Sequence, residues 1–326
     1  MIAFVFPGQG SQKVGMGREL ADAYPVARET FDEADGAFRA DGDQASLSQL
    51  CFAGPEDQLT LTEITQPAIL SASTAACRVL AAQGIAPAFV AGHSLGEYSA
   101  NVAAGTMSVQ AAVALVRRRG RYMQEAVPVG TGAMAAILGS DLATVSRACQ
   151  EAAEGDVVSP ANVNGPGQIV IAGTAAAVAR ACERAKALGA RRAIPLSVSA
   201  PFHCALMKPA EERLAPELRA LPARDPGVPV IANVDAEPKR DGPSAIEALV
   251  RQVSAPVQWD AVVRRLASEG VTTYVEVGPG TVLSGLIRKI LEDMSRHSRD
   301  TANAGARVVS FGAPADLAAV VTACSS

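Results

Sequence analysis

The sequence has few histidines, few aromatic residues and no closely spaced cysteines. Its 326 residues include six scattered cysteines and no C-x-x-C pair, the spacing typical of zinc sites. We therefore expect no metal site and no disulfide framework. Only three histidines are present, His93, His203 and His297, so chemistry that needs an imidazole has few candidates.

An excess of charge of one sign is also lacking. The chain has 29 Lys and Arg residues and 33 Asp and Glu residues, for a net charge of −4. This balance does not favour a polyanion as a binding partner. The first apolar run, residues 2–6, follows no basic segment and ends at Pro7-Gly8. No other apolar stretch approaches the roughly 18 residues of a membrane span. We expect a cytoplasmic protein that binds neither nucleic acid nor membrane.

Apolar residues, by contrast, make up 49% of the chain, enough for a large core. Residues 2–6 and 88–91 are predicted to be buried strands, and the second strand runs through a sharp turn into a helix. This order is typical of a parallel α/β sheet. Further elements of the same kind are expected at residues 228–233, 246–253, 273–277 and 306–311, with a polar linker over residues 295–305.

The middle of the chain is predicted to have a different order of helices and strands. Residues 131–199 are predicted to alternate as βαββαβ, the order of a ferredoxin-like unit. We therefore expect an α/β hydrolase-like catalytic domain formed by residues 1–130 and 200–326, with a ferredoxin-like subdomain of residues 131–199 inserted into it.

The segment Gly92-His93-Ser94-Leu95-Gly96 fits the pattern G-x-S-x-G of a nucleophile elbow. Glycines on both sides permit a strained turn that exposes the serine hydroxyl, and the predicted strand and helix around it are the setting this motif requires. Ser94 is therefore the candidate nucleophile. The backbone N–H of Leu95, at the start of the helix, could stabilise an oxyanion.

A serine of ordinary pKa needs a base, and the histidines leave one candidate. His93 lies inside the elbow and His297 lies in a polar segment, so His203 is the predicted base. The neighbouring Cys204 is interpreted as structural. The chain order serine, acid, histidine also leaves Asp141 or Glu183 open as a partner of His203.

Four arginines lie on the helix predicted for residues 108–126. A projection at about 100° per residue places Arg119 at the edge of the apolar stripe. The other three, Arg117, Arg118 and Arg121, group with polar side chains, as on a solvated face. An inward guanidinium requires a carboxylate, so Arg119 is predicted to bind a ligand.

Several stretches in this order resemble the malonyl-CoA:acyl carrier protein transacylases, which are relatives of polyketide synthase acyltransferase domains. They are residues 6–12 (FPGQGSQ), 92–100 (GHSLGEYSA), 119–120 (RG), 123–128 (MQEAVP), 158–173 (VSPANVNGPGQIVIAG), 201–209 (PFHCALMKP) and 276–280 (EVGPG). The resemblance spans about Ile2 to Ile290 and leaves the final thirty or so residues uncovered.

The resemblance implies a Ser-His pair without a carboxylate. Ser94 would be acylated and His203 would be the base, with the backbone carbonyl of Gln252 orienting the imidazole. The oxyanion hole would consist of the N–H groups of Gln9 and Leu95. From the residues alone, Gln252 would be taken for a helix-surface residue.

The resemblance also implies how the substrate is held. Arg119 would bind the malonyl carboxylate, and Phe202, before the base, resembles the malonyl-selective members, although a plain core role suits it equally. Asn162, Asn164 and Met123 match positions that line the cleft in the family. An asparagine beside Gly165-Pro166 also fits ordinary turn chemistry.

The resemblance implies an enzyme that moves a malonyl group from coenzyme A to the phosphopantetheine thiol of acyl carrier protein through an acyl-serine, for fatty-acid or polyketide synthesis. The coenzyme A thioester is a substrate, no cofactor or metal is expected, and we expect a monomer. Two alternatives remain: a serine esterase or thioesterase on the same elbow, and a non-catalytic binding protein. An acyl-enzyme that persists until a thiol arrives distinguishes a transacylase from an esterase.

Overall fold

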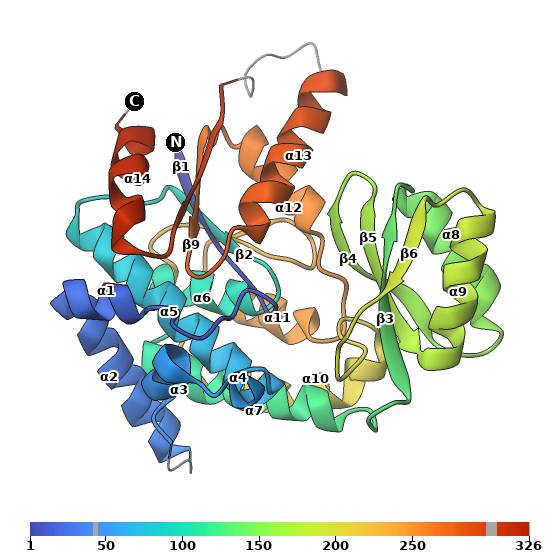
Figure 1. Cartoon of the computed structure of the whole chain (residues 1–326), viewed down its shortest axis with the longest axis horizontal. Coiled ribbons are helices and arrows are strands. Elements are labelled where there is room, and N and C mark those ends of the chain that lie inside the picture. The colour runs from blue at the N-terminus through green and yellow to red at the C-terminus, as the bar shows by residue number, and fades with distance from the viewer. Residues whose placement is uncertain (42–44, 298–304, 326) are drawn as a thin grey trace.

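The computed structural model of the chain describes residues 1–41, 45–297 and 305–325. Two β-sheets with their helices lie side by side in it (Figure 1). The first sheet contains β1 (Ile2–Phe6), β2 (Phe89–Gly92), β7 (Val230–Ile231), β8 (Pro238–Lys239), β9 (Thr273–Val277) and β10 (Arg307–Phe311). Its strand order within the described residues is β10-β9-β1-β2-β7-β8, parallel except for the edge strand β8.

Helices cover both faces of the first sheet. Those that precede the second sheet are α1 (Arg18–Ala23), α2 (Pro25–Ala40), α3 (Leu47–Ala53), α4 (Glu56–Leu59), α5 (Thr62–Ala82), α6 (Leu95–Ala103) and α7 (Val109–Glu125). Those that follow it are α10 (Lys208–Arg219), α11 (Gly242–Gln252), α12 (Trp259–Ser268), α13 (Val282–His297) and α14 (Leu317–Cys324).

The position of β1 between two layers of helices explains why its sequence is apolar throughout. Phe4 and Phe6 belong to the core shared with α2, α5 and α7, whereas Ala3 and Val5 belong to the core shared with α12 and α13. Successive side chains of a strand point to opposite faces, so a strand covered on both sides needs apolar residues at every position.

The second sheet consists of β3 (Gly132–Leu138), β4 (Val158–Gly165), β5 (Gln168–Thr174) and β6 (Arg192–Pro195). Its order is β4-β5-β3-β6, all antiparallel. Helices α8 (Leu142–Ala153) and α9 (Ala175–Ala187) cover its outer face (Figure 1).

The edge strand β4 attaches this second sheet to the rest of the molecule. The backbone N–H of Val163 donates to the Val257 carbonyl over 2.9 Å, and the N–H of Val257 donates to the Ala161 carbonyl over 2.8 Å. These bonds pair the edge of β4, which would otherwise be open, with the segment before α12.

The expected α/β architecture with a mostly parallel sheet and a second sheet is confirmed, and β9 occupies the predicted residues 273–277. Several boundaries differ from the prediction. Helix α13 continues to His297, into the predicted linker, of which residues 298–304 lie outside the described part of the chain. Helix α11 spans Gly242–Gln252 rather than residues 246–253, and β7 covers only Val230–Ile231 of the predicted residues 228–233.

The turn between β2 and α6 depends on close backbone packing. A Cβ on Gly92 would lie 1.9 Å from the Gly96 carbonyl carbon, and one on Gly96 would lie 2.0 Å from the Phe6 carbonyl oxygen. Neither neighbour is a flexible side chain that could move aside. Glycine at both positions therefore lets α6 begin directly against β1 and β2.

Replacing Gly92 with alanine is expected to destabilise the fold by at least the ~1–3 kcal/mol of an overpacked core, measured by denaturant unfolding. The matched control is Gly36→Ala on the exposed side of α2, where nothing lies within 4 Å of the added Cβ. That change should stabilise the protein slightly, because alanine is the better helix former. Equal stability of the two variants would contradict the packing argument.

Candidate active site

Ser94 and His203 both adopt backbone conformations with a positive φ, which residues other than glycine rarely adopt. Ser94 has φ 51° at the turn into α6, and His203 has φ 60°. The Ser94 N–H donates to Asn233 Oδ1 over 2.8 Å, and Asn233 Nδ2 donates to the Gly92 carbonyl over 2.7 Å. Strained residues persist where the surroundings hold them, and they cluster at functional sites.

The two side chains form a hydrogen-bonded pair. Ser94 Oγ and His203 Nε2 are 2.7 Å apart, and His203 Nδ1 lies 3.0 Å from the backbone carbonyl of Gln252. Because a carbonyl only accepts, Nδ1 carries the proton and Nε2 is left to accept the proton of Ser94. The geometry is that of a serine nucleophile with an oriented base.

His203 is held in its neutral form. Burial lowers the pKa of His203 to about 3, and the positive charge of Arg119 contributes in the same direction. Hydrogen bonds to the backbone at Gln252 and Ala255 oppose this shift. At neutral pH the imidazole is therefore free to accept a proton.

Arg119 is a buried cation beside the nucleophile. Its guanidinium donates to Gln66 Oε1 over 2.7 Å, to Gln252 Oε1 over 2.9 Å and to Ser94 Oγ over 3.2 Å. Its side chain is only 1% exposed, and no described carboxylate forms an ion pair with it. A buried charge without a counterion is costly, so this site favours an anionic ligand.

Gly120 explains how Arg119 reaches this position. A Cβ at Gly120 would lie 2.7 Å from the Thr62 carbonyl oxygen, so α7 and α5 pack closely there. This approach brings Arg119 of α7 against Gln66 of α5.

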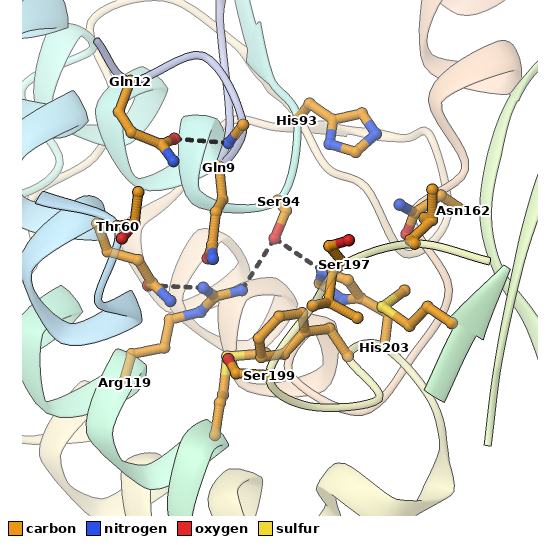
Figure 2. A pocket seen from close by; sticks show the side chains of 17 residues that line it. Gln9, Gln12, Thr60, His93, Ser94, Arg119, Asn162, Ser197, Ser199 and His203 are labelled. Carbon is orange, nitrogen blue, oxygen red and sulfur yellow. Dashed lines mark hydrogen bonds between the residues drawn. The ribbon is translucent and has the colours of Figure 1, made fainter. Parts of the chain in front are cut away.

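These groups open onto a cavity of about 480 Å³. Ser94 lies between Arg119 and His203 in it (Figure 2). The predicted residues Gln9, Met123, Asn162 and Phe202 also line this cavity. Because Met123 comes from α7 and Asn162 from β4, both sheets with their helices contribute to its walls.

The two predicted oxyanion donors flank the elbow. Leu95 is the first residue of α6, so its N–H has no acceptor within the helix. The loop after β1 presses on the same turn, because a Cβ at Gly8 would lie 2.5 Å from the His93 carbonyl oxygen. Gln9, the next residue, lines the cavity.

Neither acid left open by the sequence pairs with His203. Asp141 accepts the Thr144 N–H at the start of α8, and Glu183 pairs with Lys186. The Gln252 carbonyl takes the place that a triad acid would occupy. His93, which belongs to the elbow, lies 2.8 Å from Asn164 Oδ1 through its Nε2.

The expectation that Arg117 is solvated is wrong. Arg117 is 6% exposed, and its guanidinium lies 4.3 Å from the ring centroid of Phe38 in α2. The helix projection sorted residues by the periodicity of α7 alone, whereas α2 packs over that side. Arg118 and Arg121 are partly exposed and pair with Glu217 and Glu63.

Three polar residues of the site were missed from the sequence: Gln66, Asn233 and Glu97. Gln66 and Asn233 contact Arg119 and Ser94 from segments far away in the chain, which local periodicity does not reveal. Glu97 lies within the motif GHSLGEYSA, and burial raises its pKa to about 7.

No three histidine, cysteine or acidic side chains of residues 1–41, 45–297 and 305–325 gather as a metal ion would require. Within the same residues, no helix combines the length and apolar character needed to cross a bilayer.

Comparisons with known proteins agree with this geometry. The model of the acyl transferase domain family matches residues 3–313, further than the resemblance to Ile290 noted from the motifs. The malonyl CoA-acyl carrier protein transacylase of Escherichia coli K12 is 54% identical over 294 residues, which cover 90% of this chain and 94% of that protein. The Bacillus subtilis transacylase is 51% identical, covering 89% and 90%.

Solved structures are similar along almost the whole chain. An acyl carrier protein S-malonyltransferase from Vibrio cholerae has a TM-score of 0.91 and 46% identity, covering 98% of this chain and 99% of that one. A malonyl-transacylase in complex with a type II polyketide synthase acyl-carrier protein has a TM-score of 0.90 and 45% identity, covering 99% of both chains. The chain therefore belongs to the acyl transferase domain family and, within it, to the malonyl CoA-acyl carrier protein transacylases.

Proposed function

We propose that this protein transfers a malonyl group from coenzyme A to the phosphopantetheine thiol of acyl carrier protein through an acyl-serine at Ser94, for fatty-acid or polyketide synthesis. The observation that carries the proposal is the arrangement around one hydroxyl oxygen. Ser94 Oγ lies 2.7 Å from His203 Nε2 and 3.2 Å from the guanidinium of Arg119.

In the first half-reaction His203 Nε2 takes the hydroxyl proton of Ser94 while Oγ attacks the thioester carbonyl. The backbone N–H groups of Gln9 and Leu95 would stabilise the oxyanion. Collapse of the tetrahedral intermediate breaks the carbon–sulfur bond, and His203 gives its proton to the departing coenzyme A thiolate. The Gln252 carbonyl holds the imidazole in the required tautomer.

The second half-reaction runs the same steps in reverse with another thiol. His203 accepts the proton of the carrier thiol, and the sulfur attacks the acyl carbonyl of the malonyl-serine. Oγ then leaves and regains its proton from His203. Each half-reaction returns the enzyme to its starting protonation state, so the chemistry needs no cofactor or metal.

Arg119 would hold the malonyl carboxylate. A guanidinium can donate two parallel hydrogen bonds to a carboxylate, and the interaction is strong away from bulk water. Phe202, Met123 and Asn162 line the cavity around this position, and the ring of Phe202 would narrow the space beside the substrate α-carbon.

Arg119 also distinguishes this function from the alternatives. A general serine esterase or thioesterase needs no buried cation next to its nucleophile, whereas a malonyl group supplies the missing counterion. A non-catalytic binding protein would not need the strained Ser94 and His203 hydrogen-bonded to each other.

We also propose the finer description of the fold: a hydrolase-like α/β domain of residues 1–130 and 200–326, and a ferredoxin-like subdomain of residues 131–199. The antiparallel order β4-β5-β3-β6, with both helices on one face, supports the ferredoxin-like description. The elbow after a parallel strand supports the hydrolase-like one. The cytoplasmic location, the monomeric state and the absence of a cofactor stay predictions.

Ser94→Ala should abolish malonyl labelling and transfer, because Ser94 is the cavity hydroxyl that is hydrogen-bonded to His203. Intact-mass measurement after incubation with malonyl-CoA should show one added malonyl group on the wild-type enzyme and none on the variant. Adding carrier protein should remove the label from the wild type. Sustained hydrolysis of malonyl-CoA without carrier protein, at the rate seen with it, would instead support a thioesterase.

Arg119→Ala should lower kcat/KM for malonyl transfer by roughly tenfold to over a hundredfold, the range given by the ~1.5–3 kcal/mol of a charged hydrogen bond. Acetyl transfer should change little, because acetyl-CoA has no carboxylate. Arg119→Lys should recover little, since the fork geometry is lost. Arg118→Ala is the matched control, because Arg118 pairs with Glu217. An equal loss for both substrates in Arg119→Ala would rule out the carboxylate contact.

His203 is expected to stay neutral in the native enzyme between pH 8 and pH 5, because its pKa lies at about 3 rather than near 6.5. Below about pH 6.5 the unfolded chain binds a proton that native His203 does not, so this group lowers the stability as the pH falls. NMR of ¹⁵N-histidine-labelled enzyme, with His203→Gln to assign the signal, measures the protonation directly. An imidazolium signal for His203 at pH 5.5 would contradict the assignment.

A further inference from the structure

We propose that Glu97 is a positioning residue that orients Arg119 for the malonyl carboxylate by fixing the side-chain amide of Gln252. The inference rests on the proposed function and concerns how its binding residue is held. Glu97 lies on α6 and is 1% exposed. No step of the proposed reaction uses it.

The hydrogen bonds around Glu97 fix which way the Gln252 amide points. Glu97 Oε2 accepts from Gln252 Nε2 over 2.7 Å and from the Asn233 N–H over 3.1 Å. A carboxylate can only accept, so the amide nitrogen must face Glu97. The amide oxygen then faces Arg119, whose guanidinium donates to it over 2.9 Å.

If the side-chain amide of Gln252 were reversed, it would lose its hydrogen bonds to both Arg119 and Glu97. Its NH₂ group would point at the guanidinium of Arg119, which has donors and no acceptor, and its oxygen would point at the carboxylate of Glu97. Such unpaired contacts between buried polar groups are costly. Glu97, together with the Ser94 carbonyl that also accepts from Nε2, therefore selects one orientation of Gln252, and that orientation holds one side of the Arg119 guanidinium.

Gln252 connects this selection to the rest of the site. Its Nε2 also donates to the backbone carbonyl of Ser94 over 2.9 Å, and its own backbone carbonyl accepts from His203 Nδ1. The backbone contact with His203 does not depend on how the amide is turned. Loss of Glu97 should therefore disturb Arg119 more than it disturbs the Ser94–His203 pair.

The charges are placed to leave Arg119 available to a ligand. Glu97 and Arg119 contact opposite ends of the same amide, so the carboxylate offsets part of the guanidinium charge without forming an ion pair with it. A direct pair would compete with the substrate for the same N–H groups. The intervening amide avoids that competition.

Glu97→Met tests the proposal, because methionine has a similar length and cannot serve as the acceptor. In the full-length enzyme we expect KM for malonyl-CoA to rise at least tenfold and kcat/KM for acetyl-CoA to change less than threefold. Glu97→Gln keeps an oxygen that can accept from Gln252 Nε2 and should restore KM for malonyl-CoA to within about threefold of the wild type. Assays at pH 8 keep Glu97 ionised, since its pKa is about 7.

Gln252→Met provides an independent variant in case Glu97→Met does not fold. It removes the amide and retains the backbone carbonyl that holds His203, so it should reproduce the rise in KM for malonyl-CoA. Combining it with Glu97→Met should add little, because both changes break the same contact.

Equal losses for malonyl and acetyl transfer in Glu97→Met, or an unchanged malonyl KM in Gln252→Met, would overturn the proposal. A wild-type enzyme that forms no malonyl-serine would instead overturn the proposed function itself. If Arg119→Ala loses malonyl preference while Gln252→Met keeps it, the function stands and only the role of Glu97 fails.

Discussion

The hydrogen bond from His203 Nδ1 to the backbone carbonyl of Gln252 constrains both the chemistry and the charge of this site. It fixes the tautomer of the base as a triad carboxylate does, yet it adds no negative charge. A carboxylate at that position would be a buried anion close to Arg119 and would pair with it electrostatically. With a neutral carbonyl there, the guanidinium keeps its charge available for the proposed contact with the malonyl carboxylate.

The neutral carbonyl next to His203 also affects the pKa of this base. Burial, with a smaller contribution from the positive charge of Arg119, holds the pKa of His203 at about 3, so the imidazole is a weak base. A malonyl carboxylate bound to Arg119 would offset that charge and raise the pKa of His203, while the larger effect of burial would remain. Binding of the correct acyl group would thus improve the base that the acylation needs, whereas acetyl-CoA would not.

The sequence predicts the parts of this site that rest on local signals. Ser94 follows from the elbow, His203 from the small number of histidines, and Arg119 from the edge of an apolar stripe. Gln252 was reached only through the family resemblance, because it acts on His203 through a backbone carbonyl that every residue type possesses. Arg117 was misplaced because the periodicity of one helix does not reveal which neighbour packs against it. Gln66 and Asn233 depend on the tertiary fold, since their partners lie 53 and 139 residues away in the sequence.

The contacts between the two sheets determine how firmly the walls of the cavity are held in place. Its walls come from both sheets, so the position of Asn162 relative to Ser94 depends on how β4 is attached to the rest of the chain. Backbone hydrogen bonds join β4 to Val257, and the contact of His93 with Asn164 adds a side-chain link directly at the elbow. Backbone pairing of this kind resists sliding, because a shift would leave several buried polar groups unpaired at once. A transacylase must hold its acyl-serine until a second thiol arrives, and a cavity whose two walls are locked together near the nucleophile leaves little freedom for water to attack at the productive angle.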